Sequence, residues 1–419
     1  MKKWKSVLFF LVLMFCFACL PATDAQAAVK LNKSTLSLLE GQSATLKLTG
    51  TKKTVTWKSN KKTVATVSSK GKVTAKAPGS AVISATAGKT TKKCKVTVSI
   101  DYAKIYEYQI KYGKVTINKL LRISEADLVI PETIEGCPVT DLADGLFKDC
   151  DGLETITLPS GVTKIGNSTF YGCHTLREIK GGGVITSLGS YAFYECNALE
   201  TLPDLSQISS IGEYTFYNCD ALTVVSTSAT LTSVGNYAFF DCDKLLNFYA
   251  PDGVVSIGDY AFKSCDSLLL VNGFKNVQTI GTECFMDCKQ LGNASLGDKL
   301  VTLGAGCFSG CECLGAIKLA PTLTSIPDRC FYNCYAISNL SIPNNVTKIG
   351  NMAFFNCFQL TYLTIPGTNI SSIAEDAFSG VQFANLNIFY RASTPAGYID
   401  NWINQMKQRG LSADRVHTI

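Results

Sequence analysis

The sequence predicts a β-rich protein of 419 residues, in which a small β-sandwich is followed by a long solenoid of stacked coils. Two observations lead to this prediction. Residues 29–99 alternate apolar and polar side chains in short runs that turn residues separate. From residue 147 onward, a Phe that precedes a Cys by three positions recurs every 23 residues. A fixed period of this length indicates similar coils that stack on one another.

The first 27 residues have the features of a secretory signal peptide. Three lysines precede the apolar run VLFFLVLMFCFACL over residues 7–20, and AQA at residues 25–27 offers small residues for cleavage. The run is too short for a membrane span, and no second candidate follows it. We therefore expect an exported, soluble mature chain that begins near Ala28 and has no membrane span after signal removal.

Residues 28–100 form the predicted sandwich. Runs such as ATLKL, TVTWKS and KVTAKA alternate with turns such as EGQS and APGS, which is the pattern of an antiparallel β-sandwich. Trp57 supplies a core anchor, and the single Cys94 means that the domain lacks an internal disulfide. The run WKSNKKTVATVSSKGKVTAKAPGSAVISATAG over residues 57–88 resembles the bacterial Ig-like domain of group 2, with its Trp-x-Ser, Ala-x-Val-Ser and Gly-x-Val-Thr-Ala in order. This resemblance implies a spacer or adhesion module of a bacterial surface protein.

Charge divides the chain into a basic and an acidic part. Residues 28–99 contain 15 lysines, no arginine and one acidic residue, Glu40, whereas residues 100–419 carry a net charge of −10. The lysines fall mostly on the polar side of the alternation. There they serve solubility, or they dock the domain onto an anionic cell-wall polymer such as teichoic acid or an acidic glycan. Export and the absence of arginine argue against nucleic acid as a partner.

Residues 101–136 are the predicted N-terminal cap of the solenoid, and residues 137–388 hold about eleven 23-residue copies. One copy reads LETITLPSGVTKIGNSTFYGC over residues 153–173. We expect LxxIxL to form one strand per coil, so that the coils build a parallel sheet with ~4.8 Å between strands. The IGxxxFxxC segment should return as a turn or short 3₁₀ helix, with glycine easing the bend.

The repeat unit resembles the BspA-like leucine-rich repeats of bacterial surface proteins. The segment YEYQIKYGKVTINKLLRISEADLVIPETIEGCPVTDLADGLFKDC over residues 106–150 is similar to the N-terminal lead-in of that family, and the resemblance extends to about residue 390. It implies a right-handed leucine-rich-repeat solenoid that is secreted or displayed on a bacterial cell surface. It also implies adhesion to a protein or glycan of a host or neighbouring cell, with no enzymatic activity in the repeat itself.

Residues 389–419 are the predicted C-terminal cap. The stretch TPAGYIDNWINQMKQRG over residues 394–410 places Tyr398, Ile399, Trp402, Ile403 and Met406 at helical spacing. An amphipathic helix there would cover the open edge of the last coil, as solenoids require.

Cysteine recurs in ten copies, and its role admits several interpretations. A catalytic thiol needs a base, but the chain has only two histidines and neither recurs with the cysteines. Zinc binding is suggested by seven sulfurs in CFMDC, CFSGCEC and CFYNC, although these spacings are not Cys-x-x-Cys pairs. In these segments Cys284, Cys307 and Cys330 occupy a slot that holds Ala or Thr in other copies, which favours packing. The recurring cysteines are Cys150, Cys173, Cys196, Cys219, Cys242, Cys265, Cys288, Cys311, Cys334 and Cys357.

Disulfides are the remaining alternative, because export permits them. Equivalent residues of adjacent coils would lie ~5 Å apart, within the range that a disulfide allows. However, ten side chains that point in parallel do not gain more from pairing as disulfides than from apolar packing. In addition, Val381 replaces the cysteine of the last copy. We interpret the series as a structural ladder of buried thiols, with oxidation at Cys307 and Cys330 as the open alternative.

Tyrosine recurs on both sides of the repeated Phe. One interpretation is that half-buried rings stack from coil to coil, and the other is that they form an aromatic stripe that binds a protein or glycan. Acidic residues after the cysteines (Asp151, Asp220, Asp243 and Asp266) are either a solvated edge or favour a basic partner or a cation. The candidate partner-binding residues are Tyr171, Tyr191, Tyr194, Tyr214, Tyr217, Tyr237 and Tyr260.

The sequence shows no phosphate loop, paired-carboxylate signature, nucleophile elbow or zinc motif. We therefore expect no enzyme, no cofactor and no metal. The predicted function is that of a secreted, surface-associated binding protein. The alternative is a structural component of the cell envelope or matrix that acts by self-association.

Overall fold

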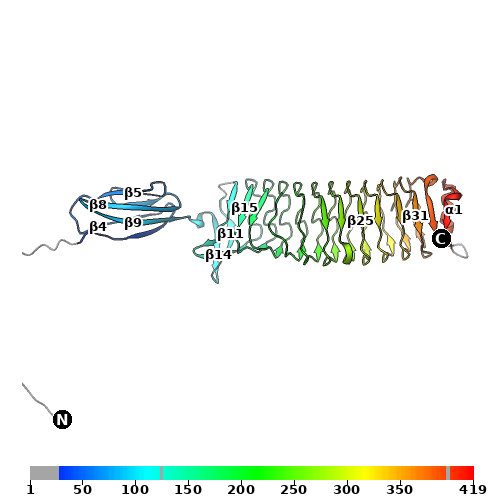
Figure 1. The fold of residues 1–419 in the computed structure, drawn as a ribbon, viewed down its shortest axis with the longest axis horizontal. Coiled ribbons are helices and arrows are strands. Elements are labelled where there is room, and N and C mark those ends of the chain that lie inside the picture. The colour runs from blue at the N-terminus through cyan, green and yellow to red at the C-terminus, as the bar shows by residue number, and fades with distance from the viewer. Residues whose placement is uncertain (1–27, 123–125, 393–396) are drawn as a thin grey trace, which may run out of the picture. The chain divides into compact units, whose positions relative to one another are not determined.

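A computed structural model describes residues 28–122, 126–392 and 397–419 (Figure 1). The predicted signal peptide, residues 1–27, lies outside the described residues. The chain divides into two compact units, with the division between Asp101 and Tyr102. The described residues contain no helix long and apolar enough to cross a membrane. The predicted architecture, an Ig-like β unit before a parallel solenoid with one short C-terminal helix, is confirmed.

The first unit contains nine strands in small sheets. Four strands are ordered β2-β9-β8-β5, three are ordered β3-β7-β6, and β1 pairs with β4. Most pairs are antiparallel as predicted, but β2 runs parallel to β9. The sequence could not predict this pair, because apolar alternation shows which face of a strand is buried and not the direction of its neighbour. The strands are β1 (Lys30–Leu31), β2 (Thr35–Leu39), β3 (Ser43–Thr45), β4 (Leu48–Thr49), β5 (Thr56–Ser59), β6 (Ala65–Val67), β7 (Lys72–Ala75), β8 (Gly79–Ala87) and β9 (Thr90–Ser99).

The core of the first unit lies between its sheets. Ile83, Cys94 and Val96 are fully buried, whereas Trp57 is only partly buried and packs against the edge of this core. Trp57 therefore contacts the core as predicted, although it is not fully buried. Its ring also covers Gly71, where an added Cβ would lie 2.8 Å from the indole and 2.4 Å from the carbonyl oxygen of Leu46. Gly71 also has a φ of 78°, so both its backbone and its surroundings require glycine.

The second unit begins with a cap made of a hairpin and short strands. Strands β10 and β11 are antiparallel, β11 runs parallel to β14, and β12 runs parallel to the first repeat strand, β15. Tyr106, Val115 and Ile117 are buried and continue the apolar core of the repeats. The cap contains a 3₁₀ helix (Tyr102–Lys104), β10 (Tyr106–Lys111), β11 (Lys114–Leu120), β12 (Asp127–Val129), β13 (Thr133–Ile134) and β14 (Cys137–Leu142).

The LxxIxL segments form the predicted parallel sheet. Partners are 23 residues apart through most of the sheet, as in Asn247 opposite Leu270. Between β17 and β21 the two intervening coils contribute only an isolated bridge from Glu178 to Thr201. The strands are β15 (Thr155–Leu158), β17 (Glu178–Gly181), β21 (Asn247–Tyr249), β23 (Leu270–Asn272), β25 (Asn293–Ser295), β27 (Ala316–Lys318), β29 (Asn339–Ser341), β31 (Tyr362–Ile365), β33 (Asn387–Tyr390) and β34 (Val416–Thr418).

A second strand in each coil was not predicted. It is a dipeptide of Ser, Thr or Lys followed by Ile, Leu or Val, and in most copies the repeated glycine comes next. Two residues are too few for alternation to be recognised in the sequence. These strands also pair in parallel from coil to coil. They are β16 (Lys164–Ile165), β18 (Ser187–Leu188), β19 (Ser210–Ile211), β20 (Ser233–Val234), β22 (Ser256–Ile257), β24 (Thr279–Ile280), β26 (Thr302–Leu303), β28 (Ser325–Ile326), β30 (Lys348–Ile349) and β32 (Ser372–Ile373).

The FxxC segments are turns, and the 3₁₀ alternative is wrong for them. The residues two before and two after Phe216, Tyr214 and Asn218, have φ values of 54° and 59°. A 3₁₀ helix needs successive right-handed residues, and these left-handed positions interrupt it. Apart from the cap, the 3₁₀ helices of the described residues are Phe274–Asn276, Phe383–Asn385 and Ala413–Arg415.

The repeated glycine four residues before Phe does not ease a bend. Its φ is not left-handed in the successive copies, and what it meets is the backbone of the preceding coil. A Cβ on Gly304 would lie 2.3 Å from the carbonyl carbon of Gly281, and one on Gly258 would lie 2.6 Å from that of Gly235. The prediction of a bend is therefore corrected: at positions such as Gly258 and Gly304, glycine is favoured because adjacent coils approach too closely for a Cβ.

The core of the solenoid is a column of phenylalanine rings. Neighbouring rings from Phe147 to Phe354 are nearly parallel, with centroids 5.0–5.6 Å apart. The last ring, Phe378, contacts Trp402 of the C-terminal helix α1 (Tyr398–Gln408) at 5.4 Å. Ile399, Ile403 and Met406 are buried beside Trp402, as an amphipathic helix predicts. Tyr398 of the predicted apolar face stays exposed instead, because its hydroxyl accepts a hydrogen bond from the Ile373 N–H.

Candidate functional site

The tyrosines singled out in the sequence lie together in two adjacent columns on the FxxC side of the solenoid. Within each column the rings are nearly parallel and 4.6–4.8 Å apart, the spacing of adjacent coils. The two columns contact each other at 5.7–6.3 Å with tilts of 43–51°. We call these rings the aromatic surface: Tyr191, Tyr214, Tyr237 and Tyr260 in one column, and Tyr171, Tyr194, Tyr217 and Phe240 in the other.

Stacking decides which part of each ring a partner can reach. The ring faces within a column are covered by the neighbouring rings, and each side chain is half-buried. Lysines cover both ends, with the Nζ of Lys148 4.4 Å from the Tyr171 ring centre and that of Lys263 5.4 Å from the Tyr260 ring centre. The accessible parts are therefore ring edges and hydroxyl groups. A sugar that stacks on an aromatic face finds few free faces here, whereas a protein surface can contact the edges.

The backbone does not favour tyrosine in the first column. Tyr191, Tyr214, Tyr237 and Tyr260 have φ values of 54–58°, a region that bulky residues rarely adopt. At the same position other copies carry residues as different as Ser168, Glu283, Arg329 and Met352, also with positive φ. Four successive tyrosines at a strained position are therefore not required by the turn. Backbone strain of this kind is typical of functional sites.

Acidic side chains border the aromatic surface. Burial, followed by repulsion from Asp243 and Asp220, raises the pKa of the Asp241 carboxyl above its ordinary value. Burial and the charge of Glu195 raise the pKa of Tyr194 to about 12. Not all of the predicted acidic edge is free, because Lys289 pairs with Asp266 at 2.9 Å. No group of three His, Cys, Asp or Glu among the described residues has the arrangement of a metal site.

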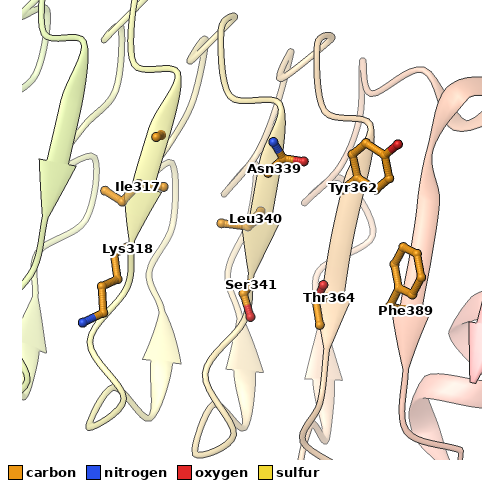
Figure 2. Close-up of a pocket in the computed structure, with 9 residues that line it drawn as sticks. Ile317, Lys318, Asn339, Leu340, Ser341, Tyr362, Thr364 and Phe389 are labelled. Atoms are coloured by element: carbon orange, nitrogen blue, oxygen red, sulfur yellow. The ribbon is translucent and has the colours of Figure 1, made fainter. Parts of the chain in front are cut away.

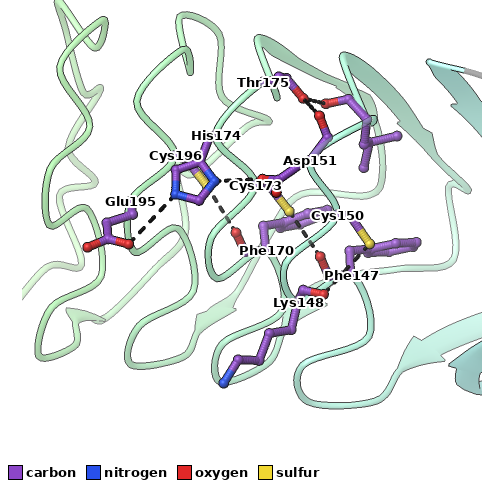
Figure 3. Close-up of polar contacts among 11 residues, drawn as sticks. Phe147, Lys148, Cys150, Asp151, Phe170, Cys173, His174, Thr175, Glu195 and Cys196 are labelled. Carbon is purple, nitrogen blue, oxygen red and sulfur yellow. Dashed lines mark hydrogen bonds and ion pairs between the residues drawn. The ribbon is translucent and has the colours of Figure 1, made fainter.

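His174 lies in this acidic column and connects two coils (Figure 3). Its Nδ1 is 2.6 Å from Asp151 Oδ1, and its Nε2 is 3.8 Å from Glu195 Oε2. The hydrogen bond to Asp151 raises the pKa of the imidazole above its usual value. The contact therefore contributes to stability in full below the unfolded-state pKa of ~6.5, and this contribution is lost as pH rises through the raised pKa. The sequence could not show this pairing, because His174 does not recur at the equivalent position of the other repeat copies.

The recurring cysteines make a contact that packing alone does not explain. The Sγ of Cys173 donates to the carbonyl oxygen of Phe147, one coil earlier, at 3.0 Å (Figure 3). The same contact recurs at 3.0–3.3 Å up to Cys357. Each thiol thus fills a small apolar site and also gives a buried carbonyl a second donor. Cys150 differs, being half-buried with its Sγ 3.8 Å from the Lys148 carbonyl oxygen, because no FxxC turn precedes the first copy.

We expect native thiols to be almost unreactive. All 16 described cysteines are free, and Cys313 is the exposed one. Burial raises the pKa of Cys219 far above its ordinary value and that of Cys150 to about 12, so little thiolate forms at neutral pH. Iodoacetamide followed by peptide mass spectrometry should label Cys313 in the folded mature protein and the remaining cysteines only in denaturant. Few free thiols in denaturant without reductant would contradict the buried-thiol ladder and indicate disulfides.

The 15 lysines of residues 28–99 are all exposed. Lys58 of β5 and Lys93 of β9 lie on either side of Ser84 in the sheet register, so they share one outward face. Glu40 is the one acidic residue of residues 28–99, so the positive charge of the 15 lysines is largely uncompensated within this segment.

Sequence reasoning missed a hollow on the outward face of the main sheet. It has a volume of about 510 Å³ and lies across β27, β29, β31 and β33 (Figure 2). One signal in the sequence could have indicated it: the residues at the outward positions of the LxxIxL segments differ in size and type from coil to coil. Its lining residues are Ala316, Ile317, Lys318, Asn339, Leu340, Ser341, Tyr362, Thr364 and Phe389.

Two family models match the chain. The BspA type leucine rich repeat region matches residues 140–269 and 271–393, which is more than half of the chain. The bacterial Ig-like domain (group 2) matches residues 26–98. No protein with a curated description matches the chain.

Several solved structures are similar to the chain. A leucine-rich repeat protein from Bacteroides ovatus is 24% identical over 68% of this chain and 69% of its own, with a TM-score of 0.50. A leucine rich cell surface protein from Faecalibacterium prausnitzii is 23% identical over 70% of this chain and 94% of its own, with a TM-score of 0.42. The pneumococcal vaccine antigen PcpA is 17% identical over 75% of this chain and 96% of its own, with a TM-score of 0.39. The Bacteroides likeness supports the solenoid fold.

Proposed function

The chain belongs to the family of BspA-type leucine-rich repeat proteins, and from this premise we propose that it is a secreted, surface-associated binding protein without catalytic activity. Export rests on the signal-peptide features of residues 1–27. The solenoid serves as a rigid support, because each coil is hydrogen-bonded and packed against the next.

The observation that carries the proposal is the aromatic surface. Tyrosine is enriched at protein interfaces because it combines apolar area with a polar tip. Here seven tyrosines form one continuous surface over five coils, and four of them occupy positions where the backbone disfavours their size. Of the two partner classes that the sequence predicts, a protein suits this surface better than a glycan, since ring edges are accessible and most ring faces are not. The neighbouring carboxylates favour a partner with basic side chains.

Replacing Tyr191, Tyr214 and Tyr237 by Ser should weaken binding of the mature protein to host or neighbouring cells by at least about tenfold, the effect of losing ~1.4 kcal/mol. Serine suits these positions, since Ser168 occupies the equivalent site with a φ of 52°. Flow cytometry with fluorescent protein would measure cell binding. The control is Tyr335→Ser, which removes a ring stacked on Phe358 at 4.7 Å outside the aromatic surface. Unchanged binding of the triple variant, with the melting temperature preserved, would exclude this surface.

The basic first unit is proposed as a spacer or as an anchor on anionic cell-wall polymer. Its 15 exposed lysines would attract polyphosphate or polycarboxylate through charge. Retention on purified Gram-positive cell walls should then fall steeply when salt approaches ~1 M, where the screening length is only ~3 Å. The variant Lys58→Gln, Lys93→Gln, Lys95→Gln should elute at lower salt than the unmodified protein. Salt-insensitive retention would rule the anchor out.

Self-association in a cell envelope or matrix is the second candidate. The opposite charges of the two units favour it, since residues 28–99 are strongly basic and residues 100–419 carry −10. Sedimentation velocity over a concentration series at low and high salt distinguishes the candidates. Assembly that grows with concentration and dissolves in salt supports self-association, whereas a monomer at all concentrations supports the binding protein.

A further inference from the structure

The hollow on the main sheet differs in chemistry from the aromatic surface and lies on another face of the coil. Its floor is formed by outward residues of adjacent strands in register, Ala316 opposite Asn339 and Asn339 opposite Tyr362. The small side chain of Ala316 leaves space beside the larger Asn339, its partner in the register of the sheet. Figure 2 shows the other lining residues of the hollow. The site is therefore created by differences between successive coils and not by a repeated feature.

One wall of the hollow is aromatic and has a free ring face. Tyr362 is 49% exposed, and its described ring contact is with Phe389, 6.4 Å away on the side of β33. No described ring stacks on its other side, toward Asn339. Phe389 is held in turn by His417, whose ring lies 4.6 Å from it. This arrangement differs from the stacked columns, because on the side of Asn339 no aromatic ring covers Tyr362, so a flat apolar group can approach the tyrosine from that side.

The remaining wall supplies hydrogen-bonding groups and one positive charge. Asn339, Ser341 and Thr364 bring an amide and two hydroxyls to the hollow. Lys318 is its one charged lining residue, and no carboxylate lines it. Asp298 lies 3.6 Å from the Lys318 ammonium, but both side chains are about 70% exposed, 69% and 71%, so this pair is weak. Residues 100–419 carry a net charge of −10, and against that background a hollow with no lining carboxylate and one ammonium group favours an anionic ligand.

We propose that the hollow binds a glycan through a carboxylated sugar residue. The apolar face of a pyranose ring packs on Tyr362, and the sugar hydroxyls hydrogen-bond to Asn339 and Ser341. The carboxylate pairs with Lys318, whose exposed side chain turns toward the glycan on binding, because its ammonium group points away from Tyr362 in the free protein (Figure 2). This site is separate from the aromatic surface and does not depend on the function proposed for it.

Isothermal titration calorimetry of the mature protein with three probes tests the proposal. The probes are sialyllactose, an oligosaccharide that contains glucuronic acid, and neutral lactose. At least one acidic probe should bind at least tenfold more tightly than lactose. Lys318→Gln should reduce that affinity at least tenfold while leaving lactose unaffected, and Tyr362→Ala should reduce it further. Both residues are exposed, so neither change should alter the melting temperature.

Tyr249→Ala is the matched control, because Tyr249 is 55% exposed on the outward face of the same sheet, outside the hollow. Its affinity for the acidic probe should equal that of the unmodified protein. No binding of either acidic probe, equal binding of acidic and neutral probes, or equal losses in the Tyr249 and Tyr362 variants would each overturn the proposal. The triple tyrosine variant of the aromatic surface should bind the acidic probe normally, which separates the two sites.

Discussion

Phe262→Ala is expected to destabilise the solenoid by about 3–5 kcal/mol, the usual cost of truncating a buried phenylalanine. Phe262 is fully buried, and the rings of Phe239, Phe248 and Phe285 lie 5.0, 4.7 and 5.3 Å from it. Each coil is stabilised only by its neighbours, so a gap in the column weakens both interfaces of the coil. Limited proteolysis should begin in the coils around residue 262, and the urea midpoint should fall.

The matched control is Phe358→Ala. Phe358 also belongs to a stacked pair, with Tyr335 at 4.7 Å, but it is 41% exposed on the solenoid surface. Its truncation should cost less than ~1.5 kcal/mol, since little of its area is removed from water and an aromatic pair contributes ~0.5–1.5 kcal/mol. Equal losses for the two variants would show that the phenylalanine column is not what holds the coils together.

Gly304→Ala should destabilise the protein although alanine normally favours folding. A Cβ at this position would lie 2.3 Å from the carbonyl carbon of Gly281 and 2.3 Å from the Thr282 nitrogen, which are backbone atoms of the preceding coil. These atoms can move away only if the two coils separate, so we expect a loss of at least ~1–3 kcal/mol, the cost of overpacking. Thermal and urea unfolding would measure it.

The control for this substitution is Gly292→Ala, where an added Cβ meets nothing within 4 Å. Neither glycine has a left-handed φ, so alanine should be neutral or stabilising by up to ~1 kcal/mol at Gly292, because it restricts the unfolded chain. Effects of opposite sign at the two positions would confirm the close approach of coils. Tolerance of alanine at both would contradict it.

Features that recur with the period were predictable. When residues 23 apart share a type, stacking places them in one column, so the phenylalanine and tyrosine columns follow from the sequence once the coils are stacked. The helical spacing of Ile399, Trp402, Ile403 and Met406 likewise predicted α1 and its buried face. The second strand of each coil was missed because it is two residues long, and the role of the repeated glycine was missed because its backbone neighbours lie in another coil.

The sequence alone determined the order of the two units and the residues that face the core, because the period and the alternation of apolar residues follow from burial. Only the tertiary structure decided which surfaces can bind. Most tyrosine faces are unavailable because the rings cover one another, a consequence of a spacing of 4.6–4.8 Å that composition does not show. The hollow beside Tyr362 combines residues from four coils that share no repeated pattern. Such sites arise where the repeat copies differ in sequence. Only the stacking of the coils in three dimensions brings the differing side chains next to one another.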